Sequence, residues 1–300
     1  MYKIATVTTA YNQFQDFNNW KSHYKEYCDE ISYHIIVDNN SSDEYKKLYK
    51  PEFKNSIILE FSEGKGVTGG YNEAIKYIQE NLEIDFILFI MQDMNIPSKG
   101  VTILANCLNK DPEIGAIAPV NLYENKSNII REHGGTINKN DFSVKKHYLN
   151  QELNSSVPEM LEVDFLCGGN YMFRGEVFNK IGLYDEKIFM YGDEVDILMR
   201  LANYGYKVFS TTKTVCYHEH IYEVINGKNV RFPSNNALFF TGRNYFYLIN
   251  KYGNYKNLVF GIIKAIYKSI RFILVSLIKN GSLIKPYYLV KGYAKGFFYS

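Results

Sequence analysis

The sequence predicts an α/β protein with a doubly wound, mostly parallel sheet flanked by helices, and a helical, basic C-terminal appendage. Strand-like and helix-like segments alternate over the first part of the chain, which is typical of parallel sheets with crossover helices. Residues 86–91 form an apolar run that ends at a lone carboxylate, Asp93, before Pro97, as expected of a buried strand. Glu223 is the last acidic residue, and twelve Lys or Arg residues follow it.

Length and composition indicate an ordered protein with one domain, or one domain and an appendage. The 300 residues are 46% apolar and 22% charged, which allows a sizeable buried core. The four cysteines are widely scattered without C-x-x-C spacing, so we expect free thiols in a reducing compartment. We see no secretory segment at the start and no apolar run of about 18 residues. We therefore expect no membrane-spanning helix.

The first strands of the predicted sheet end in polar residues. A β-branched run at 4–9 precedes a segment with large apolar residues at helical spacing. A second strand at 33–37 ends in the polar cluster 38–43. One interpretation is that Ser or Asp in this cluster caps the next helix. The other is that Asp38 accepts hydrogen bonds from a base or a ribose.

Four glycines open the helix that follows a third strand at 57–61. They lie at positions 64, 66, 69 and 70, where they permit close backbone approach and leave N–H groups for a phosphate. Their spacing matches neither the G-x-G-x-x-G of dinucleotide-binding proteins nor the G-x-x-x-x-G-K-[ST] of P-loop proteins. We therefore expect neither a Rossmann dehydrogenase nor a P-loop NTPase.

Asp93 is the first candidate ligand residue, because open α/β sheets bind ligands at the carboxyl ends of their strands. A helix at 97–108 and a strand at 114–120 are expected to follow. The chain between 121 and 159 is polar and rich in Asn and Lys, which predicts loops and a short hairpin.

Two further carboxylates, Asp193 and Glu194, fall at the N-terminus of a predicted helix. One interpretation is that they merely complement the helix dipole. The other is that one of them is a catalytic base, since three carboxylates within four residues are costly unless a cation or an acceptor hydroxyl is nearby.

Strand-like segments at 208–210 and 214–217 precede His218, Glu219 and His220. Histidine and carboxylate at a strand end are candidate metal ligands, although a lone His is more often a core residue. Two His with one Glu at this spacing fit no closed zinc pattern, so we do not expect structural zinc.

Taken together, these motifs resemble a family 2 glycosyltransferase, in particular the bacterial rhamnosyltransferases and cell-surface polysaccharide transferases. The resemblance covers about residues 3–220. The matching motifs are Thr-Ala-Tyr-Asn at 9–12, Val-Asp-Asn-Asn-Ser-Ser-Asp at 37–43, Gly-x-x-Gly-Gly-x-Asn at 66–72, the aspartate after the apolar strand, Cys-Gly-Gly at 167–169, Ile-Gly-Leu-Tyr-Asp at 181–185, and Tyr-x-Asp-Glu-Val-Asp at 191–196 with Arg200.

The resemblance implies a GT-A-like, Rossmann-related catalytic domain at residues 1–225, a nucleoside-diphosphate sugar donor, Mg²⁺ or Mn²⁺, and inversion at the anomeric carbon. By position, Asp38 would bind the base, with Ala10 beside it. Asp93 would hold the metal, with His218 near the metal and diphosphate. The other residues that the resemblance places at the nucleotide sugar are Thr9, Tyr11, Asn40, Gly66, Gly70, Asn72, Gln92, Gly168 and Gly169.

Two departures from the family pattern concern the metal and the base. Met91 stands at the first position of the D-x-D element, so one of two expected carboxylates is missing. The usual Glu-Asp pair is inverted, and by position we favour Glu194 as the base, with Asp193 as the alternative. In direct displacement the base would take the proton of the acceptor hydroxyl, while the cation neutralises charge on the departing diphosphate.

The C-terminal region, residues 226–300, is expected to be helical and basic. At 100° per residue, a helix over 257–279 places Lys264, Lys268, Arg271 and Lys279 within about 80° of one another. Mostly apolar residues fill the rest of its circumference, which favours an amphipathic helix in the interface of an anionic membrane. The alternative is packing on the catalytic domain with the charged stripe outward. Nucleic acid is disfavoured, because the wide apolar face would then have no role.

We therefore predict a cytoplasmic enzyme, peripheral at the inner face of the cell membrane, that adds a sugar to a surface glycan or a polyprenyl-linked acceptor. The alternative, motivated by Met91, is a non-catalytic nucleotide-sugar or glycan-binding relative that acts as a scaffold in polysaccharide assembly. A nucleotidyltransferase is disfavoured, since a basic triphosphate-gripping motif near the N-terminus is absent. The sequence identifies neither the sugar nor the linkage, and it leaves open whether the chain forms a homodimer.

Overall fold

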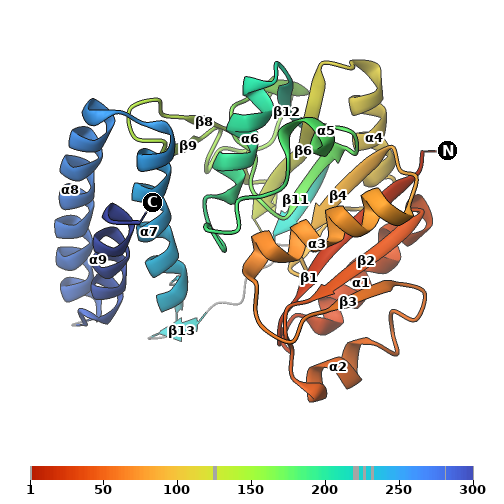
Figure 1. Ribbon diagram of the computed structural model, residues 1–300, viewed down its shortest axis with the longest axis horizontal. Helices are drawn as coiled ribbons and strands as arrows, with labels where there is room; N and C mark the ends of the chain where they lie inside the picture. The colour runs from red at the N-terminus through yellow and green to blue at the C-terminus, as the bar shows by residue number, and fades with distance from the viewer. Residues whose placement is uncertain are drawn as a thin grey trace. The chain divides into compact units, whose positions relative to one another are not determined.

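The computed structural model of the chain describes residues 2–123, 127–218, 223–225, 228–230, 233–280 and 282–299. Helices and strands alternate along the first part of the chain, as predicted (Figure 1). The strands are β1 (Ile4–Ala10), β2 (Tyr33–Asp38), β3 (Ile57–Glu60), β4 (Phe86–Ile90), β5 (Met94–Asn95), β6 (Ile114–Tyr123), β7 (Ile130–Glu132), β8 (Gly135–Ile137), β9 (Val144–Lys146), β10 (Met160–Glu162), β11 (Asn170–Arg174), β12 (Lys207–His218), β13 (Glu223–Ile225) and β14 (Lys228–Val230). The helices are α1 (Phe17–Tyr27), the short 3-10 helix η1 (Cys28–Glu30), α2 (Asp43–Tyr49), α3 (Gly66–Asn81), α4 (Gly100–Lys110), α5 (Val177–Ile181), α6 (Asp193–Asn203), α7 (Asn235–Tyr252), α8 (Tyr255–Asn280) and α9 (Ile284–Phe297).

Within the described part of the chain, ten strands form one large sheet in the order β10-β12-β6-β11-β4-β1-β2-β3, with β5 paired to β12 and β7 to β6. Neighbours from β3 through β2 and β1 to β4 are parallel, and β12 is parallel to β6. β11 runs antiparallel between β4 and β6. The predicted fold class is therefore confirmed, and β4, which precedes Asp93, lies inside the sheet.

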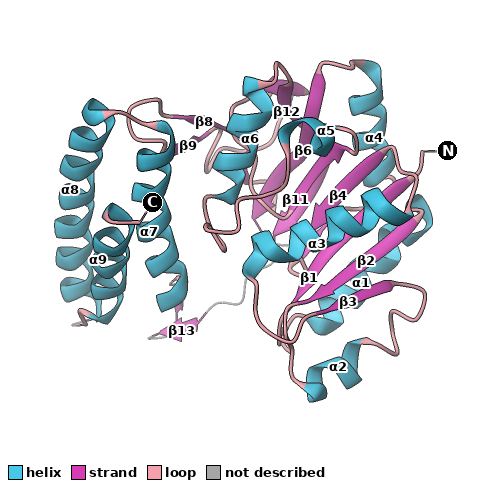
Figure 2. Cartoon of the chain, viewed as in Figure 1, coloured by secondary structure: helices cyan, strands magenta, loops and turns pink. Residues whose placement is uncertain are grey.

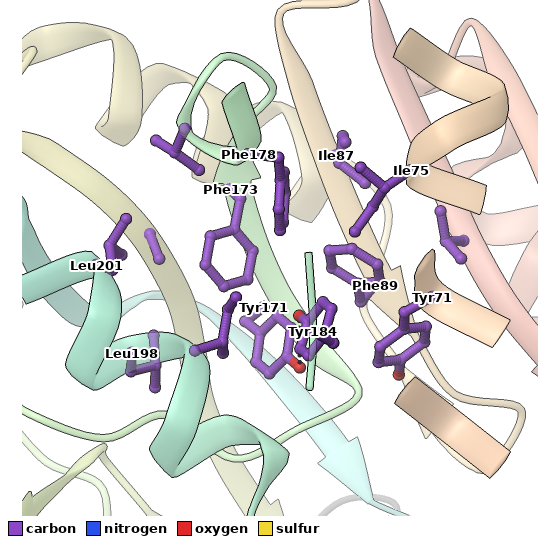
Figure 3. Packing of buried hydrophobic residues seen from close by; sticks show 14 of the residues in the cluster. Tyr71, Ile75, Ile87, Phe89, Tyr171, Phe173, Phe178, Tyr184, Leu198 and Leu201 are labelled. Carbon is purple, nitrogen blue, oxygen red and sulfur yellow. Dashed lines mark hydrogen bonds between the residues drawn. The ribbon is translucent and has the colours of Figure 1, made fainter. Parts of the chain in front are cut away.

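Different helices cover the two faces of the sheet, because successive side chains of a strand point to opposite faces. Ile87 and Phe89 of β4 belong to a buried cluster with residues of α3, α5 and α6, and the alternate residues of β4 pack with α1 and α4. The ring of Phe89 lies 4.5 Å from that of Tyr71 and 5.8 Å from that of Tyr184, between centroids (Figure 3). This packing fixes β4 and therefore the start of the segment that carries Asp93.

Residues 207–218 form one strand and not two. The sequence predicts separate strands at 208–210 and 214–217, but β12 runs continuously from Lys207 to His218. Its pairing with β6 shifts register between Thr211 and Val215. The prediction of two strands was wrong, because the polar break in the apolar pattern is an irregularity within one strand and not a turn.

The chain divides into two compact units. The first contains Met1–Thr136, Lys146–Glu186 and Ile197–His220, and the second contains Ile137–Lys145, Lys187–Asp196 and Ile221–Ser300. The second unit is largely helical, with α7, α8 and α9 packed against one another (Figure 2). α8 covers the helix predicted at 257–279. No helix among the described residues is long and apolar enough to cross a membrane.

Candidate active site

The structure brings Asp93 and His218 together, although 125 positions separate them in the chain. Asp93 comes shortly after the end of β4, and β5 pairs antiparallel with the end of β12 so that His218 lies opposite Met94. The distance from His218 Nε2 to Asp93 Oδ2 is 3.0 Å, and both side chains are largely buried. β5 is not among the strands predicted from the sequence, because a strand of two residues has no periodic signal. This short strand aligns the two predicted metal-site residues.

The Asp93 and His218 pair suits a divalent cation that is shared with a substrate. Carboxylate suits Mg²⁺ and Mn²⁺, and imidazole is a frequent ligand of divalent transition metals. No group of three or more His, Cys, Asp or Glu side chains able to hold a metal is found in the described part of the chain. Because Mg²⁺ in nucleotide sites usually takes one or two carboxylates, waters and phosphate oxygens, two protein ligands fit such an ion.

The negative charge of Asp93 affects the pKa of two residues that no sequence motif singles out, Asp16 and His23. The pKa of Asp16 is raised, mainly by burial and further by the negative charge of Asp93. Burial lowers the pKa of His23, and Asp93 offsets part of that effect. Asp93 and Asp16 thus interact unfavourably at the carboxyl end of β4, and a cation beside Asp93 would reduce this repulsion.

Met91 packs against the glycine turn that begins β11. The backbone N–H of Met91 donates to the carbonyl oxygen of Gly169 at 2.8 Å. Gly169 has a φ of +89°, and a Cβ at this position would lie 2.6 Å from Met91 Sδ. The apolar residue at the first D-x-D position thus fills the space beside Gly169, and Gly168 next to it is half-buried.

Glu132, which no sequence motif singles out, binds the backbone of the same turn. Its Oε1 accepts the backbone N–H of Cys167 at 2.8 Å, and its carboxylate pairs with Lys146 at 2.7 Å. Burial raises the pKa of Glu132, and the charge of Lys146 opposes that effect. Glu132 lies in the polar region for which the sequence predicts only loops and a hairpin, so no local pattern marks it.

The polar cluster 38–43 forms hydrogen bonds within itself and with α2. Asp38 is fully buried, and its two carboxylate oxygens accept the Ser41 N–H and the Tyr49 O–H, each at 2.7 Å. Ser42 caps α2 by accepting the Tyr45 N–H at 3.3 Å, as one of the two interpretations predicts. Asp38 therefore shapes the loop in this structure, and its contact with a base stays a prediction.

Other residues predicted at the nucleotide fall at the same ends of β1 and β2. Ala10 lies beside Asp38 in the strand register, and Thr9 is half-buried next to it. Tyr11 and Asn40 are exposed, Tyr11 by 58%. These two exposed side chains stand where a ligand at the carboxyl edge of the sheet could contact them.

The remaining predicted donor residues support the fold at this edge. Gly66 begins α3, and a Cβ on Gly70 would lie 3.2 Å from Thr9 Cγ2, so Gly70 lets α3 pack closely on β1. The Asn72 amide donates to the carbonyl oxygen of Tyr184 at 3.0 Å and accepts its N–H at 2.8 Å. Gln92 Nε2 donates to the buried Tyr45 hydroxyl at 3.1 Å. Contact of these four residues with the donor stays a prediction.

Asp193 and Glu194 lie in the second unit and begin α6, as predicted. Asp193 is buried and Glu194 is half-buried, with Glu194 Oε2 accepting the Gly192 N–H at 3.1 Å. Burial raises the pKa of Asp193 well above its usual range, and the charge of Glu194 and a hydrogen bond to it raise it further. A protonated Asp193 would donate to Glu194, which is the more accessible carboxyl group of the pair.

The parallel half-sheet, the inserted antiparallel β11 and the polar edge beyond β4 define a GT-A glycosyltransferase fold. It is shared with GalNAc-T7 solved with UDP, GalNAc and Mn²⁺, at a TM-score of 0.61 and 14% identity over 83% of this chain. The chain spans about half of that protein, 48% of its length. It is also shared with the mannosyltransferase PcManGT from Pyrobaculum calidifontis in complex with GDP-Man and Mn²⁺, at a TM-score of 0.59 and 12% identity, covering 99% of this chain and 87% of that one.

The model of Glycosyl transferase family 2 matches residues 11–182, more than half of the chain, and the chain belongs to this family. It is similar to the O-antigen chain rhamnosyltransferase WbaN of Salmonella anatum, 22% identical over 226 residues that cover 74% of this chain and 68% of the relative. It is also similar to the low-salt glycan biosynthesis hexosyltransferase Agl10 of Haloferax volcanii, 20% identical over 249 residues that cover 79% and 76%. The resemblance drawn from the sequence motifs is confirmed.

Proposed function

We propose that the protein is an inverting glycosyltransferase that moves a sugar from a nucleoside-diphosphate sugar to a hydroxyl of a cell-surface glycan or a lipid-linked oligosaccharide. The observation that carries this proposal is the Asp93 and His218 pair at the carboxyl end of β4, in a chain of glycosyl transferase family 2. The similarity to an O-antigen chain rhamnosyltransferase and to a glycan biosynthesis hexosyltransferase supports a glycan acceptor.

Asp93 and His218 would hold Mg²⁺ or Mn²⁺, which when bound supplies positive charge to the departing diphosphate. Tyr11 and Asn40, exposed beyond β1 and β2, would contact the nucleoside, and Asp38 would fix the loop that carries Asn40. The turn at Gly168 and Gly169 would shape the sugar pocket.

Glu194 would act as the general base, because it is the more accessible of the two carboxyl groups and Asp193 is buried. It would accept the proton of the acceptor hydroxyl as that oxygen attacks the anomeric carbon. General base catalysis of this kind is worth about 10²–10⁴-fold. Burial and the charge of Glu194 raise the pKa of Asp193, and in its protonated form Asp193 would donate to Glu194 and orient that side chain.

A thermal-shift screen tests the donor and the metal together. The intact protein is heated with UDP-, GDP- and dTDP-linked sugars, each with and without Mn²⁺, since a ligand present at 100 times its Kd stabilises the folded state by about 2.7 kcal/mol. We expect one nucleotide class to raise the melting temperature in the presence of Mn²⁺, and Asp93→Ala to lose that increase. Binding of a donor without any turnover to transferred or hydrolysed sugar would instead support the scaffold alternative.

We also propose that the second unit docks on an anionic membrane, which would place the enzyme on the cytoplasmic side of the cell membrane. From Ile263 onward, seven apolar side chains of α8 are at least 46% exposed and lie within about 120° of one another on the helix. They are Ile263, Ile266, Tyr267, Ile270, Leu274, Leu277 and Ile278. An exposed apolar face of this extent marks an interaction site.

The charge around this face matches an anionic lipid surface. No Asp or Glu occurs after Glu223, and Lys264, Lys268 and Arg271 lie along one side of the exposed apolar face of α8. Lys264 does not point outward, since it pairs with Asp141 at 2.6 Å within the second unit. Arg271 is exposed.

Vesicle flotation tests the membrane proposal. We expect the protein to float with vesicles that contain phosphatidylserine and to bind less at high salt, because salt screens the basic residues. Replacement of Ile263, Ile270 and Leu274 by Ser should abolish binding, while the matched change of an exposed tyrosine of the first unit, Tyr204→Ser, should not. Equal recovery of the triple variant and the native chain would refute the role of the α8 face.

A further inference from the structure

The segment that leads into Asp193 and Glu194 has an unfavourable backbone. Phe189 and Tyr191 have φ of +65° and +63°, and Gly192 has φ of +99°. Left-handed backbone is strained for bulky side chains and persists only where the surrounding structure holds it. Surrounding contacts must therefore hold residues 187–192 in this shape.

Two consecutive residues of α7, Arg243 and Asn244, supply those contacts. Asn244 is 1% exposed, and its Nδ2 donates to the carbonyl oxygens of Ile188, Met190 and Tyr191 at 2.9, 2.7 and 2.7 Å. Arg243 Nη2 donates to the carbonyl oxygens of residues 187 and 188 at 2.7 and 2.6 Å. Four of the five carbonyls before Gly192 are thus bound by buried donors from one helix.

The orientation of both side chains is fixed. Arg243 Nε donates to Asn244 Oδ1 at 2.9 Å, which turns the amide NH₂ toward the loop carbonyls. The Arg243 guanidinium lies over the rings of Phe240 and Tyr299, at 4.7 and 5.0 Å from their centroids. Phe240 in turn stacks on Phe189, the first left-handed residue of the loop, at 4.9 Å.

α7 also holds the residues after the carboxylate pair. Lys251 and Tyr252 both donate to Oδ1 of the buried Asp196 at 2.6 Å. Asn244 and Lys251 are two helical turns apart and therefore lie on the same face of α7. One helix face thus binds the chain on both sides of Asp193 and Glu194.

α9 sets the position of α7 through backbone contact at glycines. A Cβ on Gly242 would lie 2.5 Å from the carbonyl oxygen of Leu289, and a Cβ on Gly296 would overlap the carbonyl of Arg243. The helices therefore pack at a distance that only glycine allows. The closely packed pair α7 and α9 thus supports the loop.

We propose that Arg243 and Asn244 are positioning residues of the transferase, which hold the carbonyls of residues 187–191 so that Asp193 and Glu194 point in the geometry required for proton transfer. This inference rests on the proposed function, in which that pair carries the base. It assigns the C-terminal helices a role in catalysis in addition to membrane docking. Since a displacement of about 1 Å can reduce a rate about 10²-fold, loss of these contacts should act on kcat.

The test compares Asn244→Asp with Asn250→Asp in the full chain. Both change an α7 amide that donates to backbone carbonyls, but Asn250 donates to Phe297 and Tyr299 and not to the loop. Arg243→Lys is the third variant, because it keeps the charge and loses the guanidinium contacts even if Asn244→Asp fails to fold. Hydrogen exchange of peptides spanning 187–196 is measured on each free protein, and sugar transfer is measured with the UDP-, GDP- and dTDP-linked donors.

We expect faster exchange of residues 187–194 in Asn244→Asp and Arg243→Lys and unchanged exchange in Asn250→Asp. We expect kcat to fall about 10²-fold with the donor KM within about threefold, since the donor contacts are not altered. Native exchange and native kcat in both loop variants would overturn the inference. If Glu194→Gln and Asp193→Asn retained full transfer, the base assignment itself would fail, which is a separate result.

Discussion

Replacement of Gly169 by Ala is expected to destabilise the first unit through two separable effects. The φ of Gly169 is +89°, and left-handed backbone costs a residue with a Cβ about 1–2 kcal/mol. The new Cβ would also overlap Met91 Cγ and lie 2.6 Å from Met91 Sδ. Overpacking of this kind adds about 1–3 kcal/mol. We therefore expect the free energy of unfolding to fall by about 2–5 kcal/mol.

Gly205→Ala is the matched control. Gly205 has φ of +83°, and a Cβ there would meet no atom within 4 Å. Its cost should be the backbone effect alone, about 1–2 kcal/mol. The difference between the two alanine variants therefore measures the overlap with Met91, and a Met91→Ala background should reduce that difference.

Urea unfolding monitored by tryptophan fluorescence measures both variants. Trp20 is the single tryptophan of the chain, is 2% exposed and belongs to the first unit, as do both glycines. Its signal thus reports on the unit that is being changed. Equal destabilisation by the two substitutions, in the native and in the Met91→Ala background, would refute the proposed contact between Met91 and Gly169.

Three further predictions concern the metal pair and the base. His218→Ala should reduce the increase in melting temperature that Mn²⁺ gives with a bound donor, and an undiminished increase would exclude His218 from the metal site. Asp193→Asn should stabilise the protein at pH values above the raised pKa of Asp193, because ionisation of this buried carboxyl group destabilises the native state. The stability difference between the variant and the native chain should vanish below about pH 4, where the carboxyl group is protonated in the folded and the unfolded state. Melting temperatures between pH 4 and 8 check this sign. Glu194→Gln should lower kcat by about 10²-fold or more and Asp193→Asn by less, because Asn still donates to Glu194; the reverse order would make Asp193 the base.

The sequence predicted features that short stretches encode. The apolar run of β4, its single carboxylate and the following proline located Asp93 at a strand end, and the spacing after Val195 located Asp193 at a helix N-terminus. Each signal lies within about ten residues, which is the range over which hydrophobic periodicity and capping act.

The contacts between distant residues could not be predicted in the same way. Asp38 accepts a hydrogen bond from Tyr49, and Asn72 accepts one from Tyr184, a residue 112 positions away. Arg243 and Asn244 stand within an ordinary helical pattern, so nothing local distinguishes them from solvent-facing residues. Only the fold brings the loop carbonyls to their donors.

Met91 stands where the family pattern has a carboxylate, and in the structure it packs against Gly169. Its replacement by Asp gives a further prediction. In metal-free buffer Met91→Asp should lower the melting temperature, because it loses packing on Gly169 and places a second negative charge near Asp93. Mn²⁺ should then raise the melting temperature more than in the native chain, because a second carboxylate ligand increases the affinity for the ion.

Met91→Asn is the control, since the asparagine side chain has nearly the same size as that of aspartate but carries no charge. A larger Mn²⁺ response in the aspartate variant than in the asparagine variant would mean that position 91 faces the ion, and that the native site functions with Asp93, His218 and substrate oxygens. Identical responses would mean that the side chain at 91 stays against Gly169 and that the D-x-D register does not apply to this chain. Because the readout needs only Mn²⁺ and the protein, it is independent of the sugar, the base and the acceptor.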